Sequence, residues 1–88
     1  MSAADRLRIP VPTAADAGLH RVYRRSPTRW DVYVTYRFAG AAFLGHGRVD
    51  PPKVQSEDEI RDAEARADAA ALREIRDQVG RHNHRVRP

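Results

Sequence analysis

The segment Trp30–Phe38 reads WDVYVTYRF and carries the strongest structural signal in the sheet-forming part of the chain. Aromatic and β-branched residues recur there at every second position, and mostly polar residues occupy the positions between them. Alternation of these residue types with a period of two predicts a β-strand with one apolar face. We therefore expect a sheet that buries one side of this strand.

Turn signals on both sides of this segment indicate two neighbouring strands. Residues 26–28 (Ser-Pro-Thr) have a turn composition and follow Leu19–Arg25, whereas Ala39-Gly40 gives a tight turn before Ala41–Val49. Connections this short join antiparallel neighbours. We expect a three-stranded antiparallel meander.

Two glycines in the third predicted strand indicate what lies over its inner face. Gly45 and Gly47 share that face with Phe43 and Val49. Glycine weakens a strand interior, so its presence there predicts the close approach of a helix or a ligand.

The clearest helix signal follows Asp50–Lys53, whose two prolines stop the sheet. Ser56 and Glu59 form a capping box, and the acidic first turn complements the positive end of the helix dipole. Apolar positions then repeat at spacings of three and four, with others on their flank; they are Ile60, Ala63, Ala67, Ala71, Leu72, Ile75 and Val79. Gly80 predicts the end of the helix.

These elements predict an α+β domain with the order β-β-β-α, in which the meander packs against one C-terminal helix over residues 19–80. Residues 1–18 contain prolines and no apolar stripe, so they form an arm that either lies along the domain or stays loose. Residues 81–88 (RHNHRVRP) are predicted to form a disordered basic tail.

Composition excludes several classes of function. The 88 residues allow one domain, and the absence of cysteine excludes disulfides, thiolate zinc sites and thiol catalysis. We expect a cytoplasmic protein, because no signal peptide is visible and no segment approaches the roughly 20 apolar residues of a membrane span. His82 and His84 have no carboxylate nearby in the sequence, so we expect no metal site. We also expect no catalytic residue and no cofactor, because no nucleophile–base pattern or complete glycine-rich loop is present.

Positive charge is concentrated in the predicted sheet. The net charge is +4, but residues 19–49 carry six arginines and one acid, whereas residues 50–80 carry nine acids against five basic residues. The sheet is therefore basic, and the solvent side of the helix is acidic. A basic sheet with aromatic side chains suits a phosphate backbone and stacked bases. An ordinary solvated face, or one that binds protein, is the alternative.

The candidate binding residues have cationic or stacking side chains. They are Arg21, Arg24, Arg25, Arg29, Tyr33, Arg37, His46, Arg48, Arg81, Arg85 and Arg87. The four arginines that bracket the first turn are the best local candidates for phosphate contacts. Tyr33 and His46 are the candidate stacking groups, and the three arginines of the tail would add nonspecific attraction.

The order of strand, tight turn, strand with Gly45-x-Gly47, and alanine-rich helix over residues 30–75 resembles the C-terminal half of a double-stranded-RNA-binding domain. The resemblance implies a similar packing of sheet and helix, and contact with RNA. That family also begins with a helix that reads the minor groove, which the proline-containing arm does not offer. Its second helix opens with lysines that clamp phosphates. Aligned on Ala63, these positions hold Ile60, Arg61 and Glu64. Only Arg61 keeps the charge, so the binding mode of the family is not expected here.

The sequence thus favours a non-catalytic binding protein with nucleic acid as its ligand. The alternative is a protein-binding module, such as an inhibitor, an adaptor or a subunit of a larger assembly. It would present the same basic face to an acidic protein surface, or its acidic helix to a basic one. A homodimer joined through a sheet edge or the helix is compatible with both.

Overall fold

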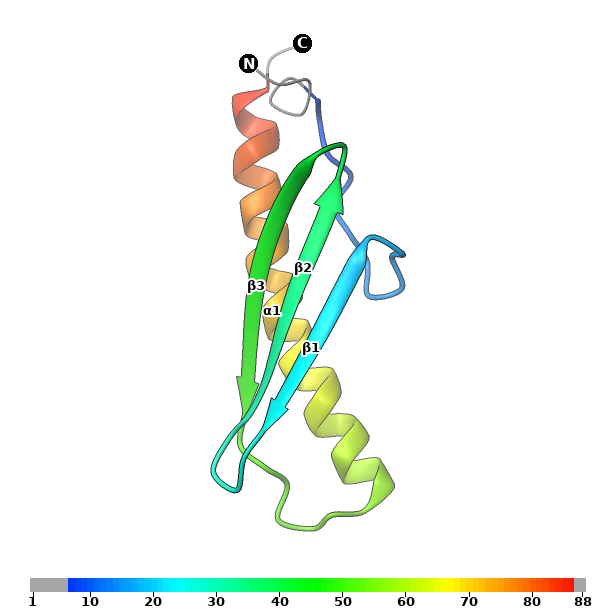
Figure 1. Ribbon diagram of the computed structural model, residues 1–88, viewed down its shortest axis with the longest axis vertical. Helices are drawn as coiled ribbons and strands as arrows, with labels where there is room; N and C mark the ends of the chain where they lie inside the picture. Colours follow the sequence, from blue (N-terminus) through cyan, green and yellow to red (C-terminus); the bar gives the residue numbers. More distant parts are fainter. Residues whose placement is uncertain (1–6, 87–88) are drawn as a thin grey trace.

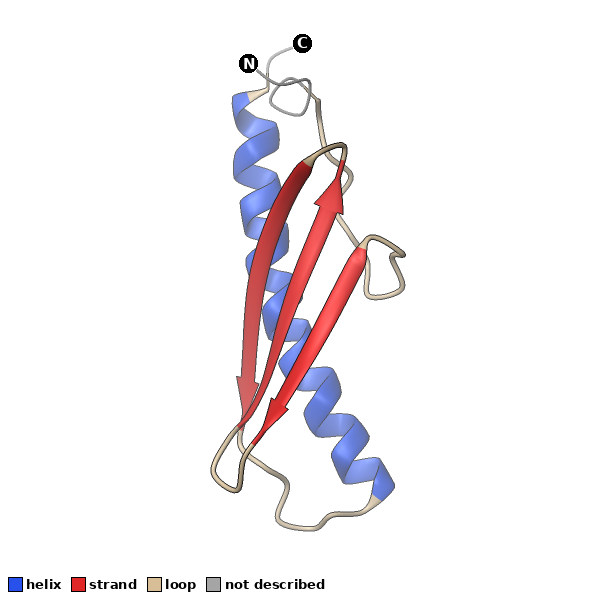
Figure 2. Cartoon of the chain, in the orientation of Figure 1, coloured by secondary structure: helices blue, strands red, loops and turns tan. Residues whose placement is uncertain are grey.

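The computed structural model describes residues 7–86 and contains three strands followed by one helix. β1 is Leu19–Arg25, β2 is Trp30–Phe38, β3 is Ala41–Val49 and α1 is Glu57–Arg85. The strands form one antiparallel sheet in the order β1-β2-β3, and α1 crosses one face of it (Figure 1). The predicted β-β-β-α order and the predicted strand bounds are confirmed, and Figure 2 shows the two layers by element type.

Short turns hold the strands in register. Ala39 and Gly40 have φ values of 50° and 85°, the positive pair that matches the twist of a two-residue hairpin. At the other end of β2, the Ser26 hydroxyl accepts hydrogen bonds from the backbone of Thr28 and Arg29 at 3.3 and 3.1 Å. The resulting register places Trp30 between Arg25 and Val49.

The inner face of the sheet is closed by α1, whose backbone approaches β3 very closely. A Cβ atom placed on Gly47 would overlap the carbonyl group of Ala67, and one on Gly45 would overlap that of Ala71. The glycines of β3 and the alanines of α1 therefore let two backbones pack without side chains between them. Aliphatic and aromatic side chains complete the buried core around them; they are Ile9, Val32, Val34, Tyr36, Ile75 and Val79.

The helix begins where the sequence predicts and ends later. Ser56 is the N-cap, and its hydroxyl accepts a hydrogen bond from Glu59 N at 3.2 Å. The prediction that α1 ends at Gly80 is wrong, because the helix continues to Arg85. Residues 81–85 are therefore helical, in contrast to the predicted disordered tail, and residues 87–88 lie outside the described part.

The last helical turns are held by the N-terminal arm. The Asn83 side chain accepts from Ile9 N at 2.7 Å and donates to Ile9 O at 2.8 Å, and Ile9 is only 3% exposed. The Tyr36 hydroxyl donates to Pro10 O at 2.9 Å. The sequence left open whether the arm lies along the domain or stays loose. Residues 7–18 lie along the domain, and residues 1–6 lie outside the described part. Since Asn83 satisfies both backbone groups of Ile9, packing against the arm stabilises helix beyond the glycine.

We expect Gly47→Ala to lower the free energy of unfolding by about 3 kcal/mol or more, because the new methyl group must push α1 away from β3. Gly80→Ala is the matched control. Nothing lies within 4 Å of a Cβ atom added at Gly80, and alanine favours a helix interior. The free energy of unfolding of this variant should therefore rise by about 0.5–1 kcal/mol. Denaturant unfolding followed by circular dichroism measures both changes. Equal effects of the two substitutions would contradict the packing described above.

Candidate functional site

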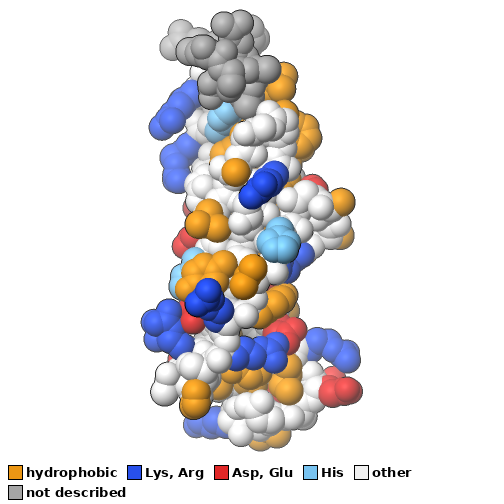
Figure 3. Space-filling model, viewed as in Figure 1, with side chains coloured by type: hydrophobic (Ala, Val, Ile, Leu, Met, Phe, Trp, Pro, Cys, Tyr) orange, Lys and Arg blue, Asp and Glu red, His pale blue; other side chains and the backbone are white. Residues whose placement is uncertain are grey.

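The face of the sheet opposite α1 is not covered by any described element, and we refer to it as the uncovered face. In Figure 1 the sheet lies in front of the helix, and Figure 3 shows this side with basic, hydrophobic and histidine side chains intermingled. The strand register arranges its side chains in rows across the three strands. Along the sheet the rows are Arg24–Asp31–Arg48, Val22–Tyr33–His46 and His20–Thr35–Leu44, followed by Arg37–Ala42.

A polar network occupies the end of the uncovered face next to the β1–β2 turn. Asp31 is only 7% exposed, and it accepts two hydrogen bonds from the Arg29 guanidinium at 2.8 and 3.0 Å. Its Oδ1 also lies 2.6 Å from His46 Nε2. The His46 ring stacks on Tyr33 with a centroid distance of 4.7 Å and an interplanar angle of 18°. Residues 33 and 46 are direct cross-strand partners, which explains why their rings meet.

These contacts control the charge of Asp31. The hydrogen bonds from Arg29, and then that from His46, lower the pKa of Asp31 from 3.8 to about 2. The carboxylate is therefore ionised at neutral pH, but Arg29 neutralises it. As a result, Asp31 does not offset the charge of the other arginines on this face.

Three arginines of the uncovered face form no ion pair within residues 7–86: Arg24, Arg37 and Arg48. All three are exposed. Arg24 and Arg48 flank Asp31 in the same row, whereas Arg37 lies near the other end of the face. A hollow of ≈ 330 Å³ opens beside Arg24 at the β1–β2 turn; it is lined by Arg24, Arg25, Ser26, Arg29, Asp31 and Tyr33.

The four arginines around the first turn do not form one cluster. The side chains of Arg21 and Arg25 point to the α1 side of the sheet, where Arg21 Nε donates to Asp68 Oδ1 at 2.5 Å and Arg25 pairs with Glu64. The hydrogen bond from Arg21 to Asp68 raises the pKa of the guanidinium above its ordinary value. The Arg25 guanidinium also lies over the Trp30 ring, 4.3 Å from its centroid. Both arginines therefore connect β1 to α1 instead of facing a ligand on the uncovered face.

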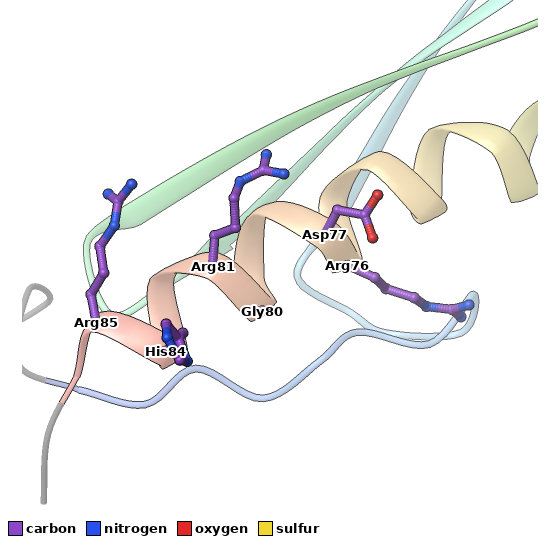
Figure 4. Close-up of a pocket in the computed structure, with 6 residues that line it drawn as sticks. All are labelled: Arg76, Asp77, Gly80, Arg81, His84 and Arg85. Carbon is purple, nitrogen blue, oxygen red and sulfur yellow. The ribbon is translucent and has the colours of Figure 1, made fainter.

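The two described arginines of the predicted tail lie on α1, on the opposite side of the sheet from the uncovered face. Figure 4 shows Arg81 and Arg85 projecting from the same side of the helix, around a shallow surface hollow of ≈ 560 Å³. Arg76 also lines this hollow, but its Nε donates to Pro12 O at 3.2 Å. Arg87 lies outside the described residues.

Sequence reasoning gave no role to Asp31 or Asn83. The polar Asp31 on an otherwise basic strand face was a usable signal, because a lone acid there needs a cationic partner. Asn83 had no such signal, since its partner Ile9 lies 74 positions away in the sequence.

Metal-ligand clusters and membrane-spanning helices are absent from residues 7–86. No group of three or more histidine, cysteine, aspartate or glutamate side chains is placed to hold a metal ion. The helix in this range is not apolar enough over a sufficient length to cross a membrane. No family model, curated protein or solved structure matches the chain. The resemblance to double-stranded-RNA-binding domains therefore stays a prediction.

We expect Asp31→Asn to lower the melting temperature at neutral pH, because the neutral amide cannot keep the charge-assisted bonds to Arg29 and His46. Because the pKa of Asp31 is lowered to about 2 in the folded state, its carboxylate stabilises the fold fully at pH values above the ordinary pKa of 3.8. This contribution is lost as the pH falls through about 2. The difference in melting temperature between the two proteins should therefore shrink as the pH falls from 5 toward about 2. Thermal unfolding across this pH range measures it, and a difference that does not depend on pH would contradict the role given to the carboxylate.

Proposed function

We propose that the protein is a non-catalytic binding protein whose uncovered face holds single-stranded nucleic acid. The observation that carries this proposal is the set of three exposed arginines without carboxylate partners in the described range, Arg24, Arg37 and Arg48. Guanidinium groups bind phosphate oxygens through paired donors. Because the acid in their midst, Asp31, is already bound by Arg29, phosphates meet a net positive surface.

The spacing of these arginines suits a strand of a few nucleotides. Arg37 lies six positions along β2 from Asp31, whose row carries Arg24 and Arg48. At the rise of an extended strand this separation is about 20 Å. The arginines thus bracket a path long enough for several phosphates.

The stacked pair of Tyr33 and His46 lies on that path, in the row next to Arg24 and Arg48. Each ring has one face turned to its partner and remains partly exposed, and in this proposal a base stacks against the exposed part of the pair. Stacking on aromatic rings is available to the unpaired bases of a single strand and not to the bases inside a duplex. The preference for single strands follows from this difference.

The segment that contains most of α1 is acidic and repels the same ligand. α1 opens with Glu57, Asp58 and Glu59, and the segment 50–80 has nine acids against five basic residues. A polyanion approaching the protein is therefore directed to the sheet.

Replacing Arg24, Arg37 and Arg48 together by glutamine should weaken binding of a fluorescent single-stranded RNA or DNA probe by about tenfold or more at low salt. The slope of log affinity against log salt concentration should become shallower by about 0.7 for each phosphate that the variant no longer neutralises. Fluorescence anisotropy over a salt series measures both quantities.

The matched control replaces Arg61, Arg66 and Arg73 of α1 by glutamine, which changes the net charge equally but leaves the uncovered face intact. This control should keep most of the affinity. An equal weakening in the two triple variants, or no binding of either probe by the unmodified protein at micromolar concentration and low salt, would refute the proposal.

Exposed apolar side chains on the same face favour a second candidate, a protein-binding module. Val22 is 43% exposed and Leu44 is 59% exposed, and both lie beside the stacked pair. An acidic protein surface with an apolar centre would match this pattern. In that case the protein should capture a stoichiometric protein partner even after nuclease treatment. Leu44→Ser should abolish this capture.

A further inference from the structure

The chain closes one edge of its own sheet with side chains from α1. Along an antiparallel strand, backbone groups of alternate residues point to the neighbouring strand and then away from it. At the outward edge of β3, Glu74 Oε2 accepts from His46 N at 3.0 Å, and Gln78 Nε2 donates to Leu44 O at 2.7 Å. A further strand cannot pair with the middle of β3 while these bonds are formed.

The opposite edge, along β1, follows the same alternation. Arg37 N donates to Gly18 O at 3.2 Å, and Ser26 N donates to Arg29 O at 2.9 Å. Even-numbered residues between these two points therefore face β2, and odd-numbered residues such as Tyr23 direct their backbone groups outward.

The N-terminal arm covers only the beginning of this edge. Leu19 N donates to Asp16 O at 3.3 Å, and the Arg21 side chain donates to Ala14 O at 2.8 Å. Beyond that point, the outward backbone groups of Tyr23 and Arg25 have no hydrogen-bond partner among residues 7–86. An exposed row of such groups is a template for strand addition.

α1 lies beneath this open edge. In Figure 1 the N-terminal half of the helix extends past β1, where a fourth strand would lie. A surface groove of ≈ 340 Å³ separates them; it is lined by Ala14, Arg21, Tyr23, Arg61, Glu64, Ala65 and Asp68. Tyr23 is 47% exposed here, so an added strand would bury apolar surface as well as pair its backbone.

The charges around the edge select the partner. Glu64 and Asp68 are already paired with Arg25 and Arg21. Arg61 on the groove side and Arg24 on the uncovered face form no ion pair within the described range. A strand added to β1 would therefore meet an unpaired cation on each of its two faces.

We propose that the open edge of β1 binds an acidic, extended segment of another protein as a fourth strand of the sheet. Main-chain hydrogen bonds to the outward groups of Tyr23 and Arg25 provide affinity. Carboxylates that face the groove meet Arg61, and those that face the other way meet Arg24. This site shares Arg24 with the uncovered face, but its main-chain pairing along β1 does not rest on nucleic-acid binding.

A second copy of the chain fits this edge less well. Two antiparallel β1 strands centred on Tyr23 would place Arg21 of each copy opposite Arg25 of the other. Like charges directly opposite each other destabilise a strand pair. An acidic partner places no cation opposite Arg21 and Arg25, and its carboxylates meet Arg61 and Arg24.

The test uses a labelled peptide of seven residues, the length of β1, with alternating glutamate and valine. Fluorescence anisotropy should show that it binds at least about tenfold more tightly than the peptide with lysine in place of glutamate. Tyr23→Pro removes one outward N–H without touching the ladder to β2, and it should weaken binding about tenfold relative to Tyr23→Ala. Amide exchange in the bound protein should slow at Tyr23 and Arg25.

Several results would overturn the proposal. These are equal affinities of the two peptides, equal binding by the two Tyr23 variants, or protection at the β3 edge instead. Sedimentation that reveals a dimer dissociated by Tyr23→Pro would assign the edge to a second copy. If Tyr23→Pro fails to fold, a glutamate peptide methylated at alternate amide nitrogens replaces it, and retained binding of that peptide refutes strand addition. The Tyr23 variants keep Arg24, Arg37 and Arg48, so nucleic-acid binding should persist in them and the two proposals fail separately.

Discussion

The contact between the α1 and β3 backbones is the constraint on which the rest of the structure depends. Gly45 and Gly47 lie directly against the carbonyl groups of Ala71 and Ala67, with no room for a Cβ between them. This contact holds α1 under β3 and β2, and the N-terminal half of the helix crosses behind β1 and extends past it (Figure 1). The pairs Arg21–Asp68 and Arg25–Glu64 span the space between β1 and this part of the helix. One close contact at the β3 edge of the sheet thus determines where long polar side chains are needed at the β1 edge.

The same geometry divides the arginines of the sheet into two groups. Those whose side chains point to the α1 side are used in connecting β1 to the helix. Those on the uncovered face have no acidic element opposite them in the described part of the chain, apart from the neutralised Asp31. The net charge of the sheet therefore overstates the number of cations available to a ligand. It is the unpaired subset, together with the stacked Tyr33 and His46, that gives the uncovered face its chemistry.

The edges of the sheet are divided in a similar way. Glu74 and Gln78 reach the outward groups of β3 because α1 lies directly beneath that strand. Within residues 7–86, no side chain of α1 is in the same position for β1, and the arm reaches only its first residues. The molecule is consequently closed to strand pairing on one edge and open on the other, and charge distinguishes the partners that can use the open edge.

The sequence alone determined the element order, the strand bounds and the inner face of each layer, because these depend on local periodicity, turns and capping. Ser56 and the glycine and alanine positions carried that information within short segments. Tertiary structure decided three other properties: the extension of α1 to Arg85, the order of the arm, and which arginines remain unpaired. Each depends on contacts between residues far apart in the chain, such as Ile9 with Asn83 or Arg21 with Asp68. Local sequence patterns do not encode such contacts, so the sequence predicted a basic sheet but could not predict which of its charges are free.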